Sequence, residues 1–581
     1  MKIQHILVAM MLACSSQALA QERAMEMRAD RTLIYPQRLE LKGDETLGDI
    51  LAIYPDLMQN GFDDMLSGYN VRIDNVAING DMRIVCRQLK AKQISKIQIC
   101  DNTAVAKGTV GLGRVIDITL VKDKKGLDGL AGVEAGTDHL ADAHAVVRDN
   151  AAKTDVIAIT SYSYQDFDDA ITQKQHLFAH MTNYFSPKDR LLTYVSQQYQ
   201  NTRSYDASGK EKVQNEKLMA RALYFHTFND QGTELLLVAN YQYGNTPYTT
   251  YMNGDEPLTQ TRSDATIFIV ELNTPLTKRL DMMAGWEGDF SYNHFKRNIG
   301  QGNTSDYLRT RYTSSNNDLY LQFNYVVGSW RFTVGDRVVF YHYSTPGAKS
   351  TDRTSTDEKW VRNDTRNNIE VSAISTLGKH SQAQAAYHRK FINPSFVIDQ
   401  DLSYEDWLDI KQGLVARYID ETKLGYNYSL RNLNFSLAAY YQMIENEQNR
   451  CRLNAAMFYR TGILALSAGA NLYLCEGDGN DFATFHLNPR LTLPWQMKLN
   501  VQSIFATGRA KLSRGEDIYL SGQLTKQWGA HWNVALEWHD ICSSHYSAGM
   551  ATVLQESSDN TGNRLRQCHE CHCHYPKLYR F

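Results

Sequence analysis

The chain has 581 residues, a formal net charge of -3 and an aromatic content of 11%. Because acidic and basic residues nearly balance, no basic surface for nucleic acid is expected. After the N-terminus, no segment has the roughly 18 continuous apolar residues of a membrane-spanning helix. Any membrane span in this chain therefore has to consist of strands.

Residues 1–20 have the features of a secretory signal peptide. Lys2 gives a basic start, Ile6 to Cys14 an apolar core, and Ala18-Leu19-Ala20 a cleavage site of the A-x-A type. A lipoprotein signal that ends at Cys14 is the rival interpretation, with a looser match. The sequence predicts export, cleavage before Gln21, and a periplasmic segment over residues 21–43.

Residues 44–122 predict a small mixed α/β unit. A helical stretch is expected from Leu47 to Tyr54, followed by the short strands "VRIDNVAING", "ISKIQIC" and "VGLGRVIDITL" with turns between them. Asn79-Gly80 is a typical tight-turn pair. This segment lacks the pattern that fills the rest of the chain.

Residues 123–581 repeat runs of about ten residues in which apolar and polar side chains alternate, as strands do. In one run Trp532, Val534, Leu536 and Trp538 alternate with residues that include the polar Asn533, Glu537 and His539. A soluble sandwich would bury the apolar side, whereas a membrane barrel would turn it to lipid. Alternation alone leaves both architectures open.

The connections between the runs favour the membrane barrel, because short turns alternate with long polar segments and about 22 strands can be counted. A secreted sandwich or propeller array is the alternative, although 34 Tyr, 20 Phe and 8 Trp suit aromatic girdles better. The short connections are Ser186–Asp189, Asn229–Gly232 and Gly529–His531, and the long ones are Asn245–Asp264, His294–Ser315 and Asn393–Val415.

The N-terminal unit carries a family resemblance. "ETLGDILAIYPDLM" resembles the opening of the plug domain of TonB-dependent outer-membrane receptors, with Pro55-Asp56 in place of a leucine-proline-glycine turn. "ISKIQICDNTAVAKGTVGLGRVIDITL" resembles the plug stretch in which a strand leads through glycines into a second strand. Glycines permit close backbone approach inside a compact domain. The matching plug positions are Pro55, Asp74, Ile97, Gly108, Gly111, Gly113, Val115 and Ile116.

The resemblance implies a mostly β fold, in which a plug (residues 44–122) fills the lumen of a transmembrane antiparallel barrel (residues 123–581) in the cell outer membrane. It implies uptake of a scarce solute, which is an iron chelate, haem, cobalamin or a glycan. The implied partners are outer-membrane lipid, that small-molecule or glycan ligand, and a TonB-type energy-coupling protein.

The segment that contacts such a coupling protein is not clear in the sequence. Receptors of this family carry a short extended TonB box near the N-terminus, which adds as a strand to the partner. Between Gln21 and Asp44 the only β-prone candidate is "RTLIYP" (Arg31–Pro36), which can equally be the first plug strand. Energy coupling therefore rests on the resemblance.

Candidate ligand residues lie in the predicted long loops, and no catalytic constellation such as G-x-S-x-G or H-E-x-x-H is present, so no enzyme activity is expected. Carboxylates between Asp399 and Ile410 suit a divalent cation, although such a run is more often a solvated loop. Aromatic side chains suit stacking on a sugar or an aromatic chelate. The residues concerned are Asp399, Asp401, Glu405 and Asp406 for the cation, and Tyr248, Tyr251 and Trp407 for stacking.

Near the C-terminus, Cys568, Cys571 and His572 match the C-x-x-C-H spacing of a c-type haem site. A covalent haem is normally enclosed by a helical domain, which the preceding residues do not supply. We therefore expect no cofactor here. The nine cysteines also include Cys451 and Cys475, which are placed at the long-loop rim of adjacent strands where they could form a disulfide.

The final eleven residues are expected to form the closing strand of the barrel, which ends on the aromatic pair Tyr579 and Phe581. Strand alternation would send the cysteines of this segment to one face and the histidines to the other, so one metal ion could not readily use them all. Weak metal binding or a disulfide is the most that we expect of Cys568, Cys571, His572, Cys573 and His574.

Two other functions stay open from the sequence. A barrel without energy coupling would serve as a surface binding or adhesion platform, and the missing TonB box would then have a natural cause. A secreted metal-binding or haem-binding protein would instead be recovered in a soluble fraction.

Overall fold

The computed structural model describes most of residues 25–557, and within this part no helix is both long and apolar enough to cross a membrane. The described strands form two sheets, a closed antiparallel barrel and a smaller six-stranded sheet. The residues left undescribed inside these limits are 28–30, 40–44, 52–68, 74–75, 78–85, 87–88, 101–113, 122–125, 137–140, 152, 168–169, 207–208, 252–257, 302–303, 346–347, 351–359, 393–416, 431, 446–448, 476–480, 496, 509–517, 529–531 and 540–546.

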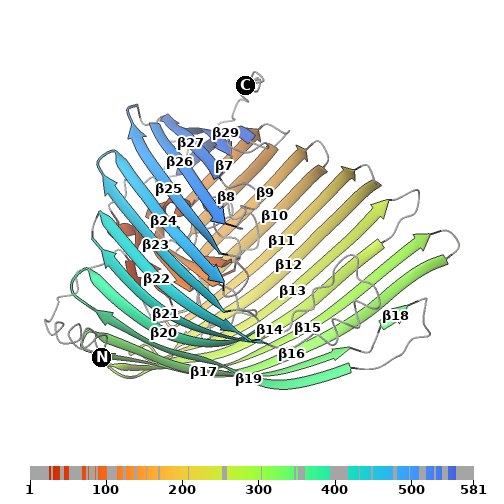
Figure 1. The fold of residues 1–581 in the computed structure, drawn as a ribbon, viewed down its shortest axis with the longest axis horizontal. Coiled ribbons are helices and arrows are strands. Elements are labelled where there is room, and N and C mark those ends of the chain that lie inside the picture. Colours follow the sequence, from red (N-terminus) through yellow and green to blue (C-terminus); the bar gives the residue numbers. More distant parts are fainter. Residues whose placement is uncertain are drawn as a thin grey trace.

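The closed barrel makes up the wall of the molecule (Figure 1). Each strand pairs with the next along the chain, except that the short β18 lies beside β16 and β17 pairs directly with β19. With β18 set aside, strands β7 to β29 give a wall of 22 described strands, which confirms the predicted barrel. Its strands are β7 (Gly126–Gly136), β8 (Ala141–Asn150), β9 (Thr154–Phe167), β10 (Ala170–Tyr184), β11 (Asp189–Asp206), β12 (Gly209–Thr227), β13 (Glu234–Tyr251), β14 (Leu258–Thr277), β15 (Leu280–Gln301), β16 (Thr304–Val327), β17 (Trp330–Thr345), β18 (Ala348–Ser350), β19 (Trp360–Thr376), β20 (Ser381–Ile392), β21 (Arg417–Ser429), β22 (Leu433–Ile444), β23 (Arg450–Thr461), β24 (Leu464–Cys475), β25 (Phe482–Leu493), β26 (Met497–Gly508), β27 (Ile518–Trp528), β28 (Trp532–His539) and β29 (Ser547–Ser557).

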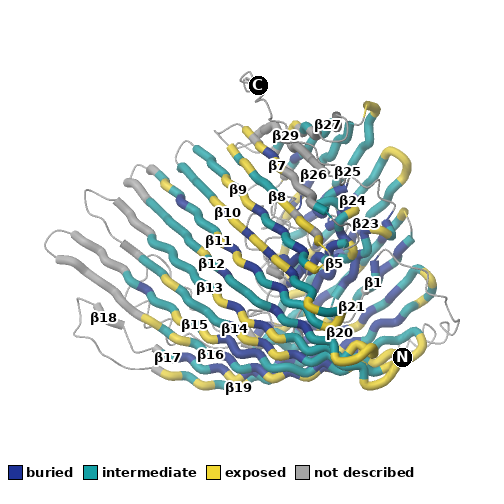
Figure 2. The backbone as a smooth tube through the Cα atoms, turned by 180° about the vertical axis from the view of Figure 1, so that it is seen from behind, coloured by how far each residue is buried: buried dark blue, intermediate teal, exposed yellow. Residues whose placement is uncertain are grey.

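The two faces of the wall differ in the way a membrane requires. On β10, Leu177 and Met181 are 50% and 39% exposed on the outside, whereas the alternate residues Phe178 and His180 are buried inside. Figure 2 shows this alternation of exposed and covered positions along the strands. Exposed apolar side chains on the outside face lipid, whereas the inner face carries polar side chains together with apolar ones, such as Phe178, that pack against the inner sheet.

Short turns connect the strands at one rim, as predicted. Ser186–Asp189 separates β10 from β11, and Asn229–Gly232 separates β12 from β13. In the second turn, Gly232 adopts a φ of +93°, a conformation that residues with a side chain rarely adopt. Because the connections at this rim are tight turns, the long strand extensions lie at the opposite rim.

Several segments that we predicted as long loops continue instead as strands. β15 has 22 residues and β16 has 24, and the pairing runs through Gln301 and Thr304, so that His294–Ser315 is almost wholly strand. β22 to β26 have 12 residues each. Because about 10 residues suffice to cross a membrane, β13 to β16, with 18 to 24 residues each, are longer than a span requires. They extend the wall on the long-loop side (Figure 1).

The smaller sheet lies inside the barrel and has the strand order β1-β2-β5-β6-β3-β4. Its apolar side chains and those on the inner face of β9 to β14 form one buried cluster, which includes Ile97 and Ile116 of the sheet and Ile157 and Ile269 of the wall. We refer to this inner sheet, with the helical turns attached to it, as the plug. Its elements are β1 (Met25–Met27), β2 (Thr32–Ile34), η1 (Pro36–Arg38), α2 (Leu47–Leu51), β3 (Tyr69–Ile73), β4 (Val76–Ala77), η3 (Ala91–Gln93), β5 (Ile94–Cys100) and β6 (Arg114–Leu120).

The N-terminal boundary of the plug differs from the predicted one. β1 and β2 belong to the plug sheet, because β1 pairs with β2 and β2 pairs with β5. The candidate TonB box Arg31–Pro36 therefore contains a plug strand. Residues 21–43, which the sequence assigned to a separate periplasmic segment, contribute to the plug core through Met25, Leu33 and Ile34.

Among the described residues, the strand that closes the barrel is β29, whereas the segment Cys571–Phe581 that we predicted as the closing strand lies outside the described residues and stays a prediction. Residues Gly549 to Ser557 of β29 pair with Gly136 to Asp128 of β7, which completes the ring. The β29 run "SAGMATVLQES" has small residues and weak alternation, so it was overlooked beside the aromatic terminus. Tyr579 and Phe581 lie outside the described residues.

This assignment predicts that Ala551→Pro prevents barrel assembly. Ala551 is flanked by Ala535 of β28 and Glu134 of β7, so a proline there removes a backbone donor from a strand with two neighbours. Heat-modifiable migration of the outer-membrane fraction on gels checks this, with Ala551→Ser as the control. Wild-type amounts of folded barrel in the proline variant would contradict β29 as the closing strand.

Candidate functional site on the inner wall and plug contacts

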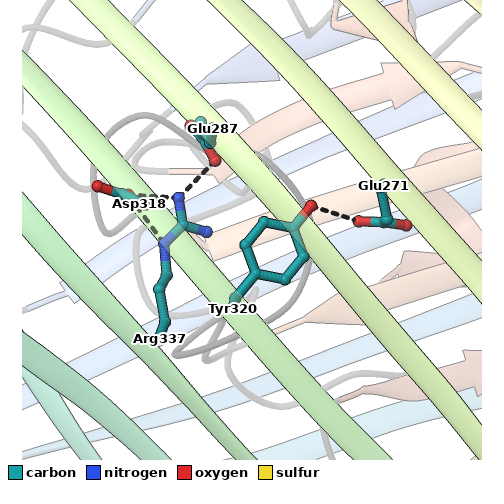
Figure 3. Close-up of polar contacts among 5 residues, drawn as sticks. All are labelled: Glu271, Glu287, Asp318, Tyr320 and Arg337. Atoms are coloured by element: carbon teal, nitrogen blue, oxygen red, sulfur yellow. Dashed lines mark hydrogen bonds and ion pairs between the residues drawn. The ribbon is translucent and has the colours of Figure 1, made fainter.

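A buried ion-pair cluster lies on the inner face of β15, β16 and β17 (Figure 3). Arg337 donates from Nη2 to Glu287 Oε2 at 2.5 Å, and from Nε and Nη2 to Asp318 Oδ2 at 2.9 and 2.6 Å. The three residues are between 2% and 8% exposed. Pairing of this kind is required, because an isolated buried charge is strongly unfavourable.

A hydrogen bond between Tyr320 and Glu271 spans β15, because Gly285 has no side chain at the position between them. In the register, Gly285 of β15 stands between Glu271 of β14 and Tyr320 of β16. The Tyr320 ring lies over the glycine, where an added Cβ would meet its Cζ at 2.3 Å. The Tyr320 hydroxyl thereby reaches across β15 and donates to Glu271 Oε2 at 2.9 Å.

Beyond these pairs, the inner wall holds carboxylate and amide oxygens without a donor. Asp289, next on the inner face after Glu287, is 8% exposed, and its Oδ1 has no hydrogen-bond partner among the described residues. The same holds for Oδ1 of Asn316, its cross-strand partner, and for Oδ1 of Asp318. The charged groups that act on Asp289 are the carboxylates of Glu287 and Asp318. Among the described residues, Glu287, Asp289 and Asp318 outnumber the guanidiniums near them, which are Arg337 and, close to Glu287, Arg221.

Aromatic side chains adjoin these oxygens on the side toward the long-loop rim. Tyr341 stands across from Asn316, and Tyr343 follows it on the same face. Their rings meet edge to face at a centroid distance of 5.3 Å, and Tyr312 packs against them. The inner face of β15 to β17 thus passes from a charged zone to an aromatic zone within a few residues.

Two ion pairs fasten the plug to the wall. Glu45 of the plug, 5% exposed, accepts from Arg460 of β23 at 2.9 Å, and Glu26 of β1 accepts from Arg331 of β17 at 3.3 Å. Burial lowers the pKa of Lys90 and the charge of Lys92 lowers it further, while Glu45 acts in the opposite direction. Glu45 therefore interacts with cations of both the plug and the wall. Its ion pair with Arg460 is more buried than the pair of Glu26 with Arg331.

The predicted plug residues that the structure describes are core residues. Ile97, Val115 and Ile116 lie on the paired strands β5 and β6 and are buried. Their burial is explained by packing of the inner sheet. The other predicted plug positions, Pro55, Asp74, Gly108, Gly111 and Gly113, lie outside the described residues.

The described residues that we predicted to bind a ligand do not belong to the inner-wall cluster. Tyr248 and Tyr251 belong to β13, where Tyr248 pairs with Val213 and Thr259, and not to a loop as expected. Within the described residues, no group of three or more His, Cys, Asp or Glu side chains is arranged to hold a metal ion, and Cys451 forms no disulfide. Outside the described residues lie Asp399, Asp401, Glu405, Asp406, Trp407, Cys568, Cys571, His572, Cys573 and His574.

Sequence reasoning missed the inner-wall cluster, although one signal for it was available. An isolated glycine inside a strand often marks a close approach of another group, and Gly285 is such a residue. Glu271, Tyr320 and Arg337 are far apart in the sequence, and only the register of β14 to β17 brings them together.

We predict that Tyr320→Phe lowers barrel stability by about 1–3 kcal/mol, because Glu271 then loses a donor while both groups are buried. Tyr241→Phe is the matched control, since Tyr241 also donates to a carboxylate, Asp264, but is 40% exposed on the outer face. The temperature at which the heat-modifiable form is lost measures both. Equal shifts in the two variants would contradict a special role for the buried bond.

No protein-family model matches the sequence, and the comparison with curated proteins gave no match. Among solved structures, the chain is similar to the ferric yersiniabactin uptake receptor FyuA from Yersinia pestis, with 10% identity over 94% of this chain and 100% of that one and a TM-score of 0.66. The alcaligin outer-membrane receptor FauA from Bordetella pertussis matches with 13% identity, coverages of 94% and 98% and a TM-score of 0.65. The copper transporter OprC matches with 9% identity, coverages of 91% and 100% and a TM-score of 0.67. The chain therefore has the fold of the TonB-dependent outer-membrane receptors that its sequence resembles.

Proposed function

We propose that the protein is an outer-membrane receptor that takes up a scarce solute, with energy supplied by a TonB-type coupling protein. The observation that carries the proposal is a separate sheet inside a closed barrel, which among the described residues is attached to the wall by side-chain contacts and not by strand pairing. Such a sheet can move without breaking the backbone hydrogen bonds of the wall. The ligand is a small molecule or a glycan, and outer-membrane lipid surrounds the barrel.

The plug contacts support a gate that stays closed at rest. Removing one partner of a buried ion pair costs about 3–5 kcal/mol in other proteins, and the Glu45–Arg460 pair is of this type. The apolar cluster shared by plug and wall adds a larger contact. Thermal motion alone would then rarely displace the plug, so transport would require an external source of energy.

The solute class is supported by the structural neighbours. FyuA is named for ferric yersiniabactin, FauA for alcaligin and OprC for copper. We propose a metal ion or metal chelate as the first class to test, with haem, cobalamin and glycans after it. We propose no catalytic role for any residue, since transport requires binding and movement of the plug and no bond to be broken.

A barrel that acts only as a surface binding platform is the second candidate. The observation that favours it is that Arg31–Pro36 contains β2, a strand of the plug sheet. This residue stretch is therefore unsuited to add as a strand to a partner while the plug is intact. Capture of the purified full-length receptor by the periplasmic domain of a TonB-type protein would discriminate between the two candidates.

The proposal predicts that a deletion strain grows poorly when one scarce solute is limiting. The test compares the deletion strain with the complemented strain on limiting iron chelates, copper, haem, cobalamin and glycans, each with and without a functional TonB-type system. A defect on one source that the wild-type gene restores only when the coupling system is present supports uptake.

Two outcomes would speak against this function. Equal growth of both strains on every source would contradict uptake of these solutes. Restoration that does not depend on the coupling system, together with failure of the capture experiment, would favour the binding platform.

A further inference from the structure

We propose that the inner wall around Asp289 and Asn316 is a binding subsite for an organic cation, such as the ammonium or guanidinium group of a transported solute. The inference rests on the proposed uptake function and names the chemistry of the solute. It concerns the wall of β15 to β17 and not the predicted loops.

The first argument is that Asp289 is an acidic side chain to which Arg337 directs none of its described hydrogen bonds. Those hydrogen bonds go to Glu287 and Asp318. Asp289 is more than nine-tenths buried, faces the lumen beside Glu287, and keeps an oxygen without a donor. Buried carboxylates are normally paired or hydrogen-bonded, so this one calls for a cationic donor.

The second argument is that the unsatisfied groups are all acceptors. The Oδ1 atoms of Asp289, Asn316 and Asp318 lack donors among the described residues, and the register places Asp289 directly across from Asn316. Ammonium and guanidinium groups carry only donors and no acceptor. Their chemistry therefore complements this set of oxygens.

The third argument distinguishes an organic cation from a metal ion. A hard metal ion needs several oxygen ligands converging on one point, and among the described residues no three His, Cys, Asp or Glu side chains converge in that way. Tyr341 and Tyr343 also adjoin the acidic zone. Aromatic faces attract ammonium and guanidinium groups, so an extended organic cation suits both zones together.

The position of the zone connects it to the plug. Ile267 and Ile269 of β14 belong to the apolar cluster that contains plug residues, and their cross-strand partners on β15 are Asp289 and Glu287. The acidic zone therefore borders the plug contact. Movement of the plug would uncover more of it, which places the subsite on the route that a solute takes through the barrel.

The test uses the purified full-length receptor and agmatine, a small molecule with one guanidinium and one ammonium group. Binding is measured by titration calorimetry in wild type and in Glu45→Gln, in which the plug is less firmly held because the partner of Arg460 loses its charge. We expect saturable agmatine binding that is stronger in Glu45→Gln. Neutral 1,4-butanediol and anionic succinate should not bind at the same concentrations.

The variants test the assignment to Asp289. Asp289→Asn in the Glu45→Gln background should weaken agmatine binding at least tenfold, and Asn316→Asp should strengthen it, so that the two changes act in opposite directions. Asp264→Asn is the matched control, because Asp264 lies on the outer face with Arg262 and Tyr241. It should leave agmatine binding unchanged.

Three results would overturn the subsite. The first is that agmatine binds neither the wild type nor Glu45→Gln. The second is that Asp289→Asn or Asn316→Asp leaves agmatine binding as strong as in the same protein without that substitution. The third is that calcium chloride binds in a way that depends on Asp289 while agmatine does not bind. If Asp289→Asn fails to fold, the opposite shift expected of Asn316→Asp still decides. Calorimetry needs no coupling protein and no growth, so a failed uptake test and a failed subsite are separate outcomes.

Discussion

The structure depends on one constraint, which is that every backbone N–H and C=O group facing lipid must find a partner within the protein. The ring of strand pairs from β7 to β29, closed by the pairing of β29 with β7, meets this constraint because it leaves no strand edge. Closure also fixes which side chains face outward. Exposed apolar residues occupy most of the outer face, and buried charged residues such as Glu287 and Arg337 are directed into the lumen.

As a result, the inner wall carries charged side chains that must be stabilised away from bulk water. Charged side chains that face the lumen become buried once the plug and the rest of the wall enclose them, so they need partners. Arg337 pairs with Glu287 and Asp318, and Arg460 pairs with Glu45 of the plug. The Tyr320 hydroxyl donates to Glu271, because the Tyr320 ring lies over Gly285. Where the pairing is incomplete, as at Asp289, the wall keeps a capacity to bind a cationic group.

The architecture could be predicted from the sequence because alternation and plug motifs are local signals. Ile97 and Ile116, which we predicted as plug positions by resemblance, lie on the paired strands β5 and β6 and are buried, and these strands read as short apolar runs. The strand extensions of β15 and β16 were predicted as loops, because beyond the membrane both faces are polar and the alternation disappears. The inner-wall cluster could not be predicted, because it depends on a register that joins Glu271, Gly285 and Tyr320 across three strands.

The central claim is that the six-stranded sheet closes the lumen of the barrel. Single-channel recording in planar bilayers tests it most directly, by comparing the full-length protein with a variant that lacks residues 25–120. The account predicts no stable conductance for the full-length protein and large, steady open channels for the variant, once both are shown to be heat-modifiable. Equal conductance of the two folded proteins would contradict the claim.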